Sequence, residues 1–168
     1  PLIPYTMKGV VWYQGENNAF RHEEYGELFS LLISDWRSKW DNDFPFYYVQ
    51  IAPYFNYYNS NAPLREVQRK ALEIPKTGMV VTLDIGEKYD IHPSNKHDVG
   101  FRLARYALKN DYKIDLIDSG PLYMSQSIHE DVIKVFFKHF GDGLVLDEIG
   151  DSEFEVAGMD KNYFVADV

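Results

Sequence analysis

A carboxylate and an imidazole lie two residues apart in the polar segment 84–96. They belong to Asp90 and His92, and Pro93 fixes the backbone directly after the histidine. A histidine can act as a general base when a carboxylate orients its ring, so this pair could activate a nucleophile. The same spacing also fits an Asp90 that caps a turn and a His92 that packs locally. The sequence is therefore compatible with a catalytic pair and with a local turn.

A second polar turn contains Gln14, Gly15, Glu16 and Asn18. Glycine and asparagine allow the tight backbone of a turn between a strand and a helix. This turn follows the apolar residues 9–13, and the Asp90 segment follows the apolar residues 79–83. Apolar runs of this length, rich in β-branched and aromatic residues, are typical of buried strands. We therefore expect two loops at the carboxyl ends of strands, where parallel α/β sheets hold active sites.

The remaining pattern predicts the elements between these loops. A further buried strand is expected at residues 46–51. Helices are expected at residues 21–40, from Pro63 to the turn at 74–78, and at 96–110, the last capped by Ser94 or Asn95. This alternation of strands and helices predicts an α/β fold, with a parallel sheet between layers of helices.

Gln68 falls on the apolar stripe of the second predicted helix. A buried amide needs hydrogen-bond partners, so Gln68 either ties down a neighbouring loop or marks a face that is only half buried.

The character of the chain changes after residue 118. Strand-like runs at residues 132–137, 143–146, 154–157 and 163–166 are separated by Gly, Asp and Asn, and residues 159–162 suit a hairpin connection. We therefore expect an α/β domain over residues 1–118 and an incomplete antiparallel β-rich segment over residues 119–168.

Composition narrows the class of partner. A formal net charge of −9 and a pI near 4.9 argue against binding to nucleic acid or to an anionic membrane, because both need clustered Lys and Arg. The chain has no cysteine, which excludes disulfides and thiolate metal sites. A neutral or small ligand is the expected partner.

Two segments together resemble a known family. Residues 9–19, Gly-Val-Val-Trp-Tyr-Gln-Gly-Glu-Asn-Asn-Ala, resemble the WYQGExNA block of the sialate O-acetylesterases. Residues 90–96, Asp-Ile-His-Pro-Ser-Asn-Lys, resemble their DIHPxNK block. Supporting matches lie at residues 1–6, 64–68, 120–123 and 154–158, so the resemblance to this family of SGNH hydrolases covers nearly the whole chain.

The resemblance implies a three-layer, flavodoxin-like α/β/α fold and a serine esterase that removes acetyl groups from sugar hydroxyls through an acyl-enzyme. His92 would be the general base, oriented by Asp90, although Glu16 or Asp84 could orient it instead. The oxyanion or substrate pocket, supported by Gln68, would consist of Gln14, Gly15, Glu16 and Asn18. The implied reaction uses no cofactor and no metal. The implied partner is an acetylated sugar, on sialic acid, xylan or another glycan, and the family favours a secreted or periplasmic location.

The nucleophile that the resemblance implies is not found in this sequence. The family's serine lies in an N-terminal block similar to GQSN, and neither that block nor a GxSxG elbow occurs here. The chain begins at Pro1 and stops at Val168 in a strand-like run, so we expect a fragment that is inactive alone. A missing strand would leave an edge or an apolar face uncovered, which predicts self-association or pairing with the missing N-terminal segment.

Two other functions fit parts of the sequence. A metal-dependent hydrolase could use Asp84, Asp90, His92 and His97, although their spacing resembles no common zinc motif. A non-catalytic carbohydrate-binding protein could stack sugars on Trp12 and on the aromatic residues within 54–58. Packing of the same aromatics within their loop is the other interpretation.

Overall fold

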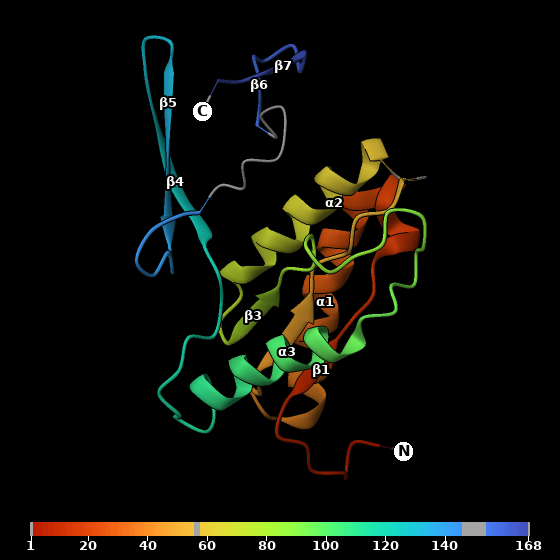
Figure 1. Cartoon of the computed structure of the whole chain (residues 1–168). Helices are drawn as coiled ribbons and strands as arrows, with labels where there is room; N and C mark the ends of the chain where they lie inside the picture. Colours follow the sequence, from red (N-terminus) through yellow and green to blue (C-terminus); the bar gives the residue numbers. More distant parts are fainter. Residues whose placement is uncertain (1, 56–57, 146–153, 168) are drawn as a thin grey trace. The chain divides into compact units, whose positions relative to one another are not determined.

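A three-stranded parallel sheet lies at the centre of residues 1–120, which form one of two compact units (Figure 1). The computed structural model describes residues 2–55, 58–145 and 154–167. The strands are β1 (Val10–Trp12), β2 (Phe46–Val49) and β3 (Thr77–Val80), and they pair in the order β1-β2-β3. Trp12 pairs with Tyr48, and Val49 pairs with Val80. The predicted parallel sheet is confirmed.

Helices cover both faces of this sheet (Figure 1). Helices α1 (His22–Trp40) and α2 (Tyr58–Lys70) lie on one face, and α3 (Lys96–Asn110) lies on the other. The short 3₁₀ helices η1 (Glu16–Arg21) and η3 (Ala71–Glu73) lie in the connections before α1 and after α2. The predicted three-layer α/β/α class is therefore confirmed.

The central strand β2 is buried on both faces, as its unbroken apolar sequence predicts. On one face, the ring of Tyr48 lies 5.0 Å from that of Phe29 of α1 in an edge-to-face arrangement. On the other face, Tyr47 stacks at 5.5 Å on Tyr106 of α3. Aromatic pairs with these geometries add about 1 kcal/mol each to the free energy gained by burial.

The helix ends show one correct prediction and one error. Asn95 caps α3, because its side-chain oxygen accepts a hydrogen bond from the Asp98 backbone N–H. Helix α2 begins at Tyr58 rather than at Pro63, which lies inside it. Buried Asn61 donates to the Tyr54 carbonyl at 2.9 Å, so a tertiary contact anchors the helix ahead of the proline.

The third strand begins two residues and ends three residues before its predicted bounds. It was expected at residues 79–83, but β3 ends at Val80, opposite the end of β2. The Val81 carbonyl accepts a hydrogen bond from Arg102 instead of continuing the sheet. The apolar sequence thus extends beyond the paired segment.

Residues 121–168 form the second unit. Strands β4 (Leu122–His129) and β5 (Val132–Lys138) form one antiparallel hairpin, and β6 (Glu155–Ala157) and β7 (Tyr163–Val165) form another. Strand β4 was not predicted, because its polar residues hide the pattern. The strand predicted at 143–146 is wrong for residues 143–145, and Leu146 lies outside the described residues. Within the described residues, no strand of one hairpin pairs with a strand of the other.

Candidate active site

The loop after β1, residues 13–18, is held by contacts to the core; we call it the β1 loop. Gln14 donates through its side-chain nitrogen to the Asn18 side-chain oxygen at 3.1 Å. The Asn18 backbone N–H donates to the Gly15 carbonyl at 2.8 Å. The hydroxyl of buried Tyr25 donates to the Gln14 carbonyl at 3.1 Å. Three of the predicted pocket residues are therefore brought together.

Gly15 is the residue on which this loop turns. Its φ is +154°, and a Cβ there would lie 3.0 Å from Ile51 Cγ2 and 3.3 Å from Gln68 Nε2. Only glycine suits both the backbone conformation and the close packing. Glu16 follows directly and opens η1.

Gln68 is completely buried and ties down the end of β2. Its oxygen accepts from the Ile51 N–H at 2.9 Å, and its nitrogen donates to the Val49 carbonyl at 3.3 Å. Its backbone carbonyl accepts from the Tyr48 hydroxyl at 2.7 Å. Of the two interpretations of Gln68, the structure shows the one in which the amide satisfies neighbouring backbone groups.

The loop after β3, residues 81–95, is held by side-chain charges; we call it the β3 loop. Glu87 accepts hydrogen bonds from both the backbone N–H and the hydroxyl of Ser94, each at 2.7 Å. These bonds hold the pKa of the Glu87 carboxyl below its ordinary value. Asp90 accepts from the His92 backbone N–H at 2.8 Å. The loop therefore carries its own framework of short polar contacts.

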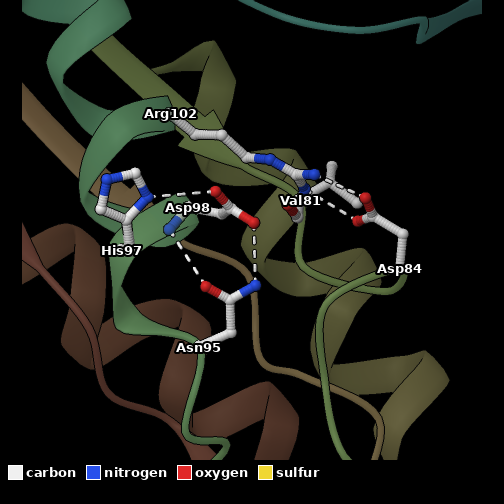
Figure 2. A network of polar contacts seen from close by, with 6 residues as sticks. All are labelled: Val81, Asp84, Asn95, His97, Asp98 and Arg102. Carbon is white, nitrogen blue, oxygen red and sulfur yellow. Dashed lines mark hydrogen bonds and ion pairs between the residues drawn. The ribbon is translucent and has the colours of Figure 1, made fainter.

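Arg102 of α3 binds the beginning of the β3 loop (Figure 2). One guanidinium nitrogen donates to the Val81 carbonyl at 2.7 Å and to Asp84 Oδ1 at 2.8 Å, and the other donates to Asp84 Oδ2. This bidentate pair holds the pKa of Asp84 below its ordinary value and raises that of Arg102. Both carboxylate oxygens of Asp84 are therefore engaged by Arg102.

One contact joins the β1 loop to the α3 end of the β3 loop. The Lys96 ammonium lies 4.7 Å from the centre of the Tyr13 ring, within cation–π range. Burial, followed by the charge of Glu16, raises the pKa of the Tyr13 hydroxyl. Lys96 ends the second family-like block and Tyr13 lies in the first, so the fold brings the two blocks to the same edge of the sheet.

The segment after β2 also lies against the β3 loop. The Phe55 N–H donates to the Lys88 carbonyl at 2.8 Å. Gly86 packs so closely on Pro53 that any Cβ would overlap the proline ring. The carboxyl ends of all three strands are therefore in contact with one another through their loops.

His92 is exposed, and so is Asp90. Within residues 2–55, 58–145 and 154–167 the His92 ring has no hydrogen-bond partner, and the Asp90 carboxylate binds the His92 backbone. The turn-capping interpretation of Asp90 is thus observed. Orientation of the imidazole by Asp90 stays a prediction.

The geometry gives little support to the two alternative functions, a metal-dependent hydrolase and a carbohydrate-binding protein. Asp84 binds Arg102, and His97 lies 3.3 Å from Asp98 (Figure 2). In the described part of the chain no three His, Cys, Asp or Glu side chains form a group that could hold a metal. Trp12 packs on Trp36 at 6.1 Å as part of the core. Of the residues 54–58, Asn56 and Tyr57 lie outside the described residues.

A groove of about 820 Å³ lies along α1 beside the outer edge of β1. Gln14 and Asn18 line one part of it, and the rest of the lining includes Trp12, Tyr25, Leu28 and Leu32. Leu28 and Leu31 are more than half exposed there, so the groove presents an uncovered apolar wall.

Sequence reasoning missed Arg102 and Glu87, which hold the β3 loop. Arg102 lies between Val99 and Leu103 on the core side of α3, and a cation on that face was a usable signal. The partner of Glu87 is seven residues away in an irregular loop, where no periodicity gives a signal.

A parallel sheet between two layers of helices, with these loops at its carboxyl edge, defines an α/β/α protein. The family model "Carbohydrate esterase, sialic acid-specific acetylesterase" matches residues 3–109, so the chain belongs to this family. It is 34% identical to the sialate O-acetylesterase of Mus musculus and 30% identical to that of Homo sapiens, in each case over 73% of this chain. It spans only 27% and 28% of those proteins, about a quarter of their length.

A solved structure agrees with this assignment. The crystal structure of a carbohydrate acetylesterase from Xanthomonas citri matches 98% of this chain with a TM-score of 0.90 and 37% sequence identity. This chain covers 40% of that protein.

Proposed function

We propose that the protein is a carbohydrate O-acetylesterase of the SGNH type, which acts on acetylated sialic acid. The observation that carries the proposal is the contact of Lys96 with Tyr13, which gathers the two family-like blocks at one edge of the sheet. Membership of the acetylesterase family and the likeness to a carbohydrate acetylesterase support it.

In this proposal His92 is the general base. Its exposed imidazole takes the proton of a serine hydroxyl as the serine attacks the acetyl carbonyl, and it returns that proton to the leaving sugar oxygen. It then activates water to release acetate from the acyl-enzyme. The side-chain N–H groups of Gln14 and Asn18 stabilise the negative charge on the carbonyl oxygen, and each such donor contributes about 3 kcal/mol.

The serine comes from chain outside residues 1–168, in a block similar to GQSN. The groove beside β1 supports this part of the proposal, because it has an apolar wall and is lined by Gln14 and Asn18. An added strand there would pair with the free edge of β1 and bring its carboxyl end to the same loops. Without it, a second copy of this chain covers the groove.

The proposed location is outside the cytoplasm, secreted or periplasmic, as the family resemblance implies. None of the helices within residues 2–55, 58–145 and 154–167 is long and apolar enough to cross a bilayer.

Acetate release from O-acetylated sialic acid tests the proposed activity. The assay compares a longer polypeptide that carries the GQSN-like block with its His92→Ala and His97→Ala variants. We expect loss of at least a thousandfold for His92→Ala. We expect little change for His97→Ala, which removes an exposed neighbouring imidazole. Full activity without His92 would refute the proposed base, and acetate release only from acetylated xylan would correct the substrate.

Light scattering of the 168-residue chain tests the proposed covering of the groove. We expect dimers or larger species, and we expect Leu28→Lys together with Leu31→Lys to make the chain monomeric. A monomer at high concentration before substitution would contradict the proposal.

A further inference from the structure

The β3 loop is attached to α3 at both of its ends. At its end, Asn95 accepts from the Asp98 N–H at 3.2 Å and donates to the Asp98 carboxylate at 2.8 Å (Figure 2). At its start, Arg102 binds Val81 and Asp84. His92 therefore lies on a segment whose two ends are fixed to consecutive turns of one helix.

The two attachments differ in kind. The Asn95 contacts form an ordinary helix cap, which belongs to the local sequence. The Arg102 contacts reach 18 and 21 residues back along the chain and close the loop. A bidentate Arg–carboxylate pair fixes both distance and orientation, which a single hydrogen bond cannot do.

We propose that Arg102 is a positioning residue for His92, which acts by closing the β3 loop on α3 through Val81 and Asp84. The inference rests on the proposed function only in that it concerns the same histidine. In this proposal Arg102 acts through the loop and not on the substrate.

Two other contacts hold the first part of the loop: buried Thr82 donates to the Gln50 carbonyl at 2.8 Å, and Gly86 packs on Pro53. Leu83 is 51% exposed, so it contributes little packing. The contacts from Glu87 to Ser94 and from Asp90 to His92 lie within the loop and move with it. Removal of the guanidinium would therefore loosen residues 83–85, between Thr82 and Gly86, while the contacts within the loop survive.

Amide hydrogen exchange in the 168-residue chain tests the attachment of the β3 loop to α3 by Arg102, without any need for catalysis. The variants are Arg102→Met, Arg102→Lys and Asp84→Asn, with Arg105→Met as the control. Arg105 lies on the same helix but donates to the Ile117 carbonyl, outside the loop. We expect exchange of the Ile85 amide, which donates to the Thr82 carbonyl, to accelerate about tenfold in Arg102→Met.

The other variants separate positioning from folding. Asp84 is largely exposed, so Asp84→Asn removes the charge pair with little risk to the core, and we expect the same direction of change. Arg102→Lys keeps the charge without the fork, and we expect an intermediate rate. We expect the exchange rate of the Asn18 amide of the β1 loop to change less than twofold in these variants. We expect the Arg105→Met control to change the Ile85 exchange rate less than twofold. Unchanged exchange at Ile85 in both Arg102→Met and Asp84→Asn would overturn the proposal.

A kinetic measurement on the longer, active polypeptide adds the link to His92. We expect Arg102→Met to lower kcat about tenfold with KM within twofold, and Arg102→Lys to recover part of kcat. A rise in KM at constant kcat would overturn the positioning role. Absence of activity in the unaltered polypeptide would refute the proposed function. The exchange result would still show whether Arg102 holds the β3 loop.

Discussion

The β1 loop and the β3 loop lie at the same edge of the sheet, but different forces hold them. Buried groups fix the β1 loop: Gly15 fits against Ile51 and Gln68, and Tyr25 binds the Gln14 carbonyl. Exposed charged groups fix the β3 loop, above all Asp84 with Arg102. The comparison indicates that buried contacts fix the oxyanion side of the proposed site, whereas the base side depends more on exposed polar and ionic contacts.

The largest effect is expected from Gln68→Leu. The leucine leaves the buried Ile51 N–H and Val49 carbonyl without partners, which costs about 3 kcal/mol in the free energy of unfolding. Urea unfolding measures this loss. The same change at exposed Gln126 of β4 is the control, with an effect of about 0.5 kcal/mol or less. Equal effects at the two sites would show that the hydrogen bonds of Gln68 to the end of β2 add no stability.

A smaller loss is expected from Gly15→Ala. The added Cβ meets Ile51 Cγ2 at 3.0 Å in a backbone conformation that favours glycine, which costs about 2 kcal/mol. Gly100→Ala is the matched control, because a Cβ there has no atom within 4 Å and the site lies inside α3. That change should stabilise by about 0.5 kcal/mol. A neutral Gly15→Ala would mean that the β1 loop adapts easily.

Lys96→Met should weaken the link between the two loops. An exposed cation–π contact of this kind contributes about 0.5 kcal/mol. A double-mutant cycle with Tyr13→Leu isolates the contact from other effects of each substitution. A coupling energy of zero would show that the contact between Lys96 and Tyr13 does not stabilise the shared site.

The smallest effect on global stability is expected from acid, and it is confined to the β3 loop. The folded-state pKa values of Asp84 and Glu87 lie below their unfolded values of 3.8 and 4.5. Their stabilisation is therefore present above those unfolded values and is lost as the pH falls through the folded pKa values. Amide exchange corrected for intrinsic rates should show the Ser94 amide losing protection before the Asn18 amide. Simultaneous loss would contradict the comparison.

The sequence predicted most of the fold, because apolar periodicity reports burial. The all-buried β2 and the capped helix α3 follow directly from their residues. The start of α2 was missed, because the Asn61 contact with Tyr54 is not visible in local sequence. Strand β4 was missed, because its exposed polar residues follow no burial pattern.

The site was predicted less completely than the fold. The motif residues Gln14, Gly15 and Asn18 do lie together, since all three belong to one tight turn. The contacts of Arg102 could not be predicted, because they join a helix to an irregular loop 18 residues earlier.

Labelling with a fluorophosphonate that reacts with activated serines tests whether His92 activates a serine from outside residues 1–168. The longer polypeptide is treated, digested and analysed by mass spectrometry, beside its His92→Ala and His97→Ala variants. We expect a label on a serine outside residues 1–168, lost without His92 and retained without His97. A label on Ser94, or one that forms at the full rate without His92, would refute the proposed pairing of His92 with an outside serine.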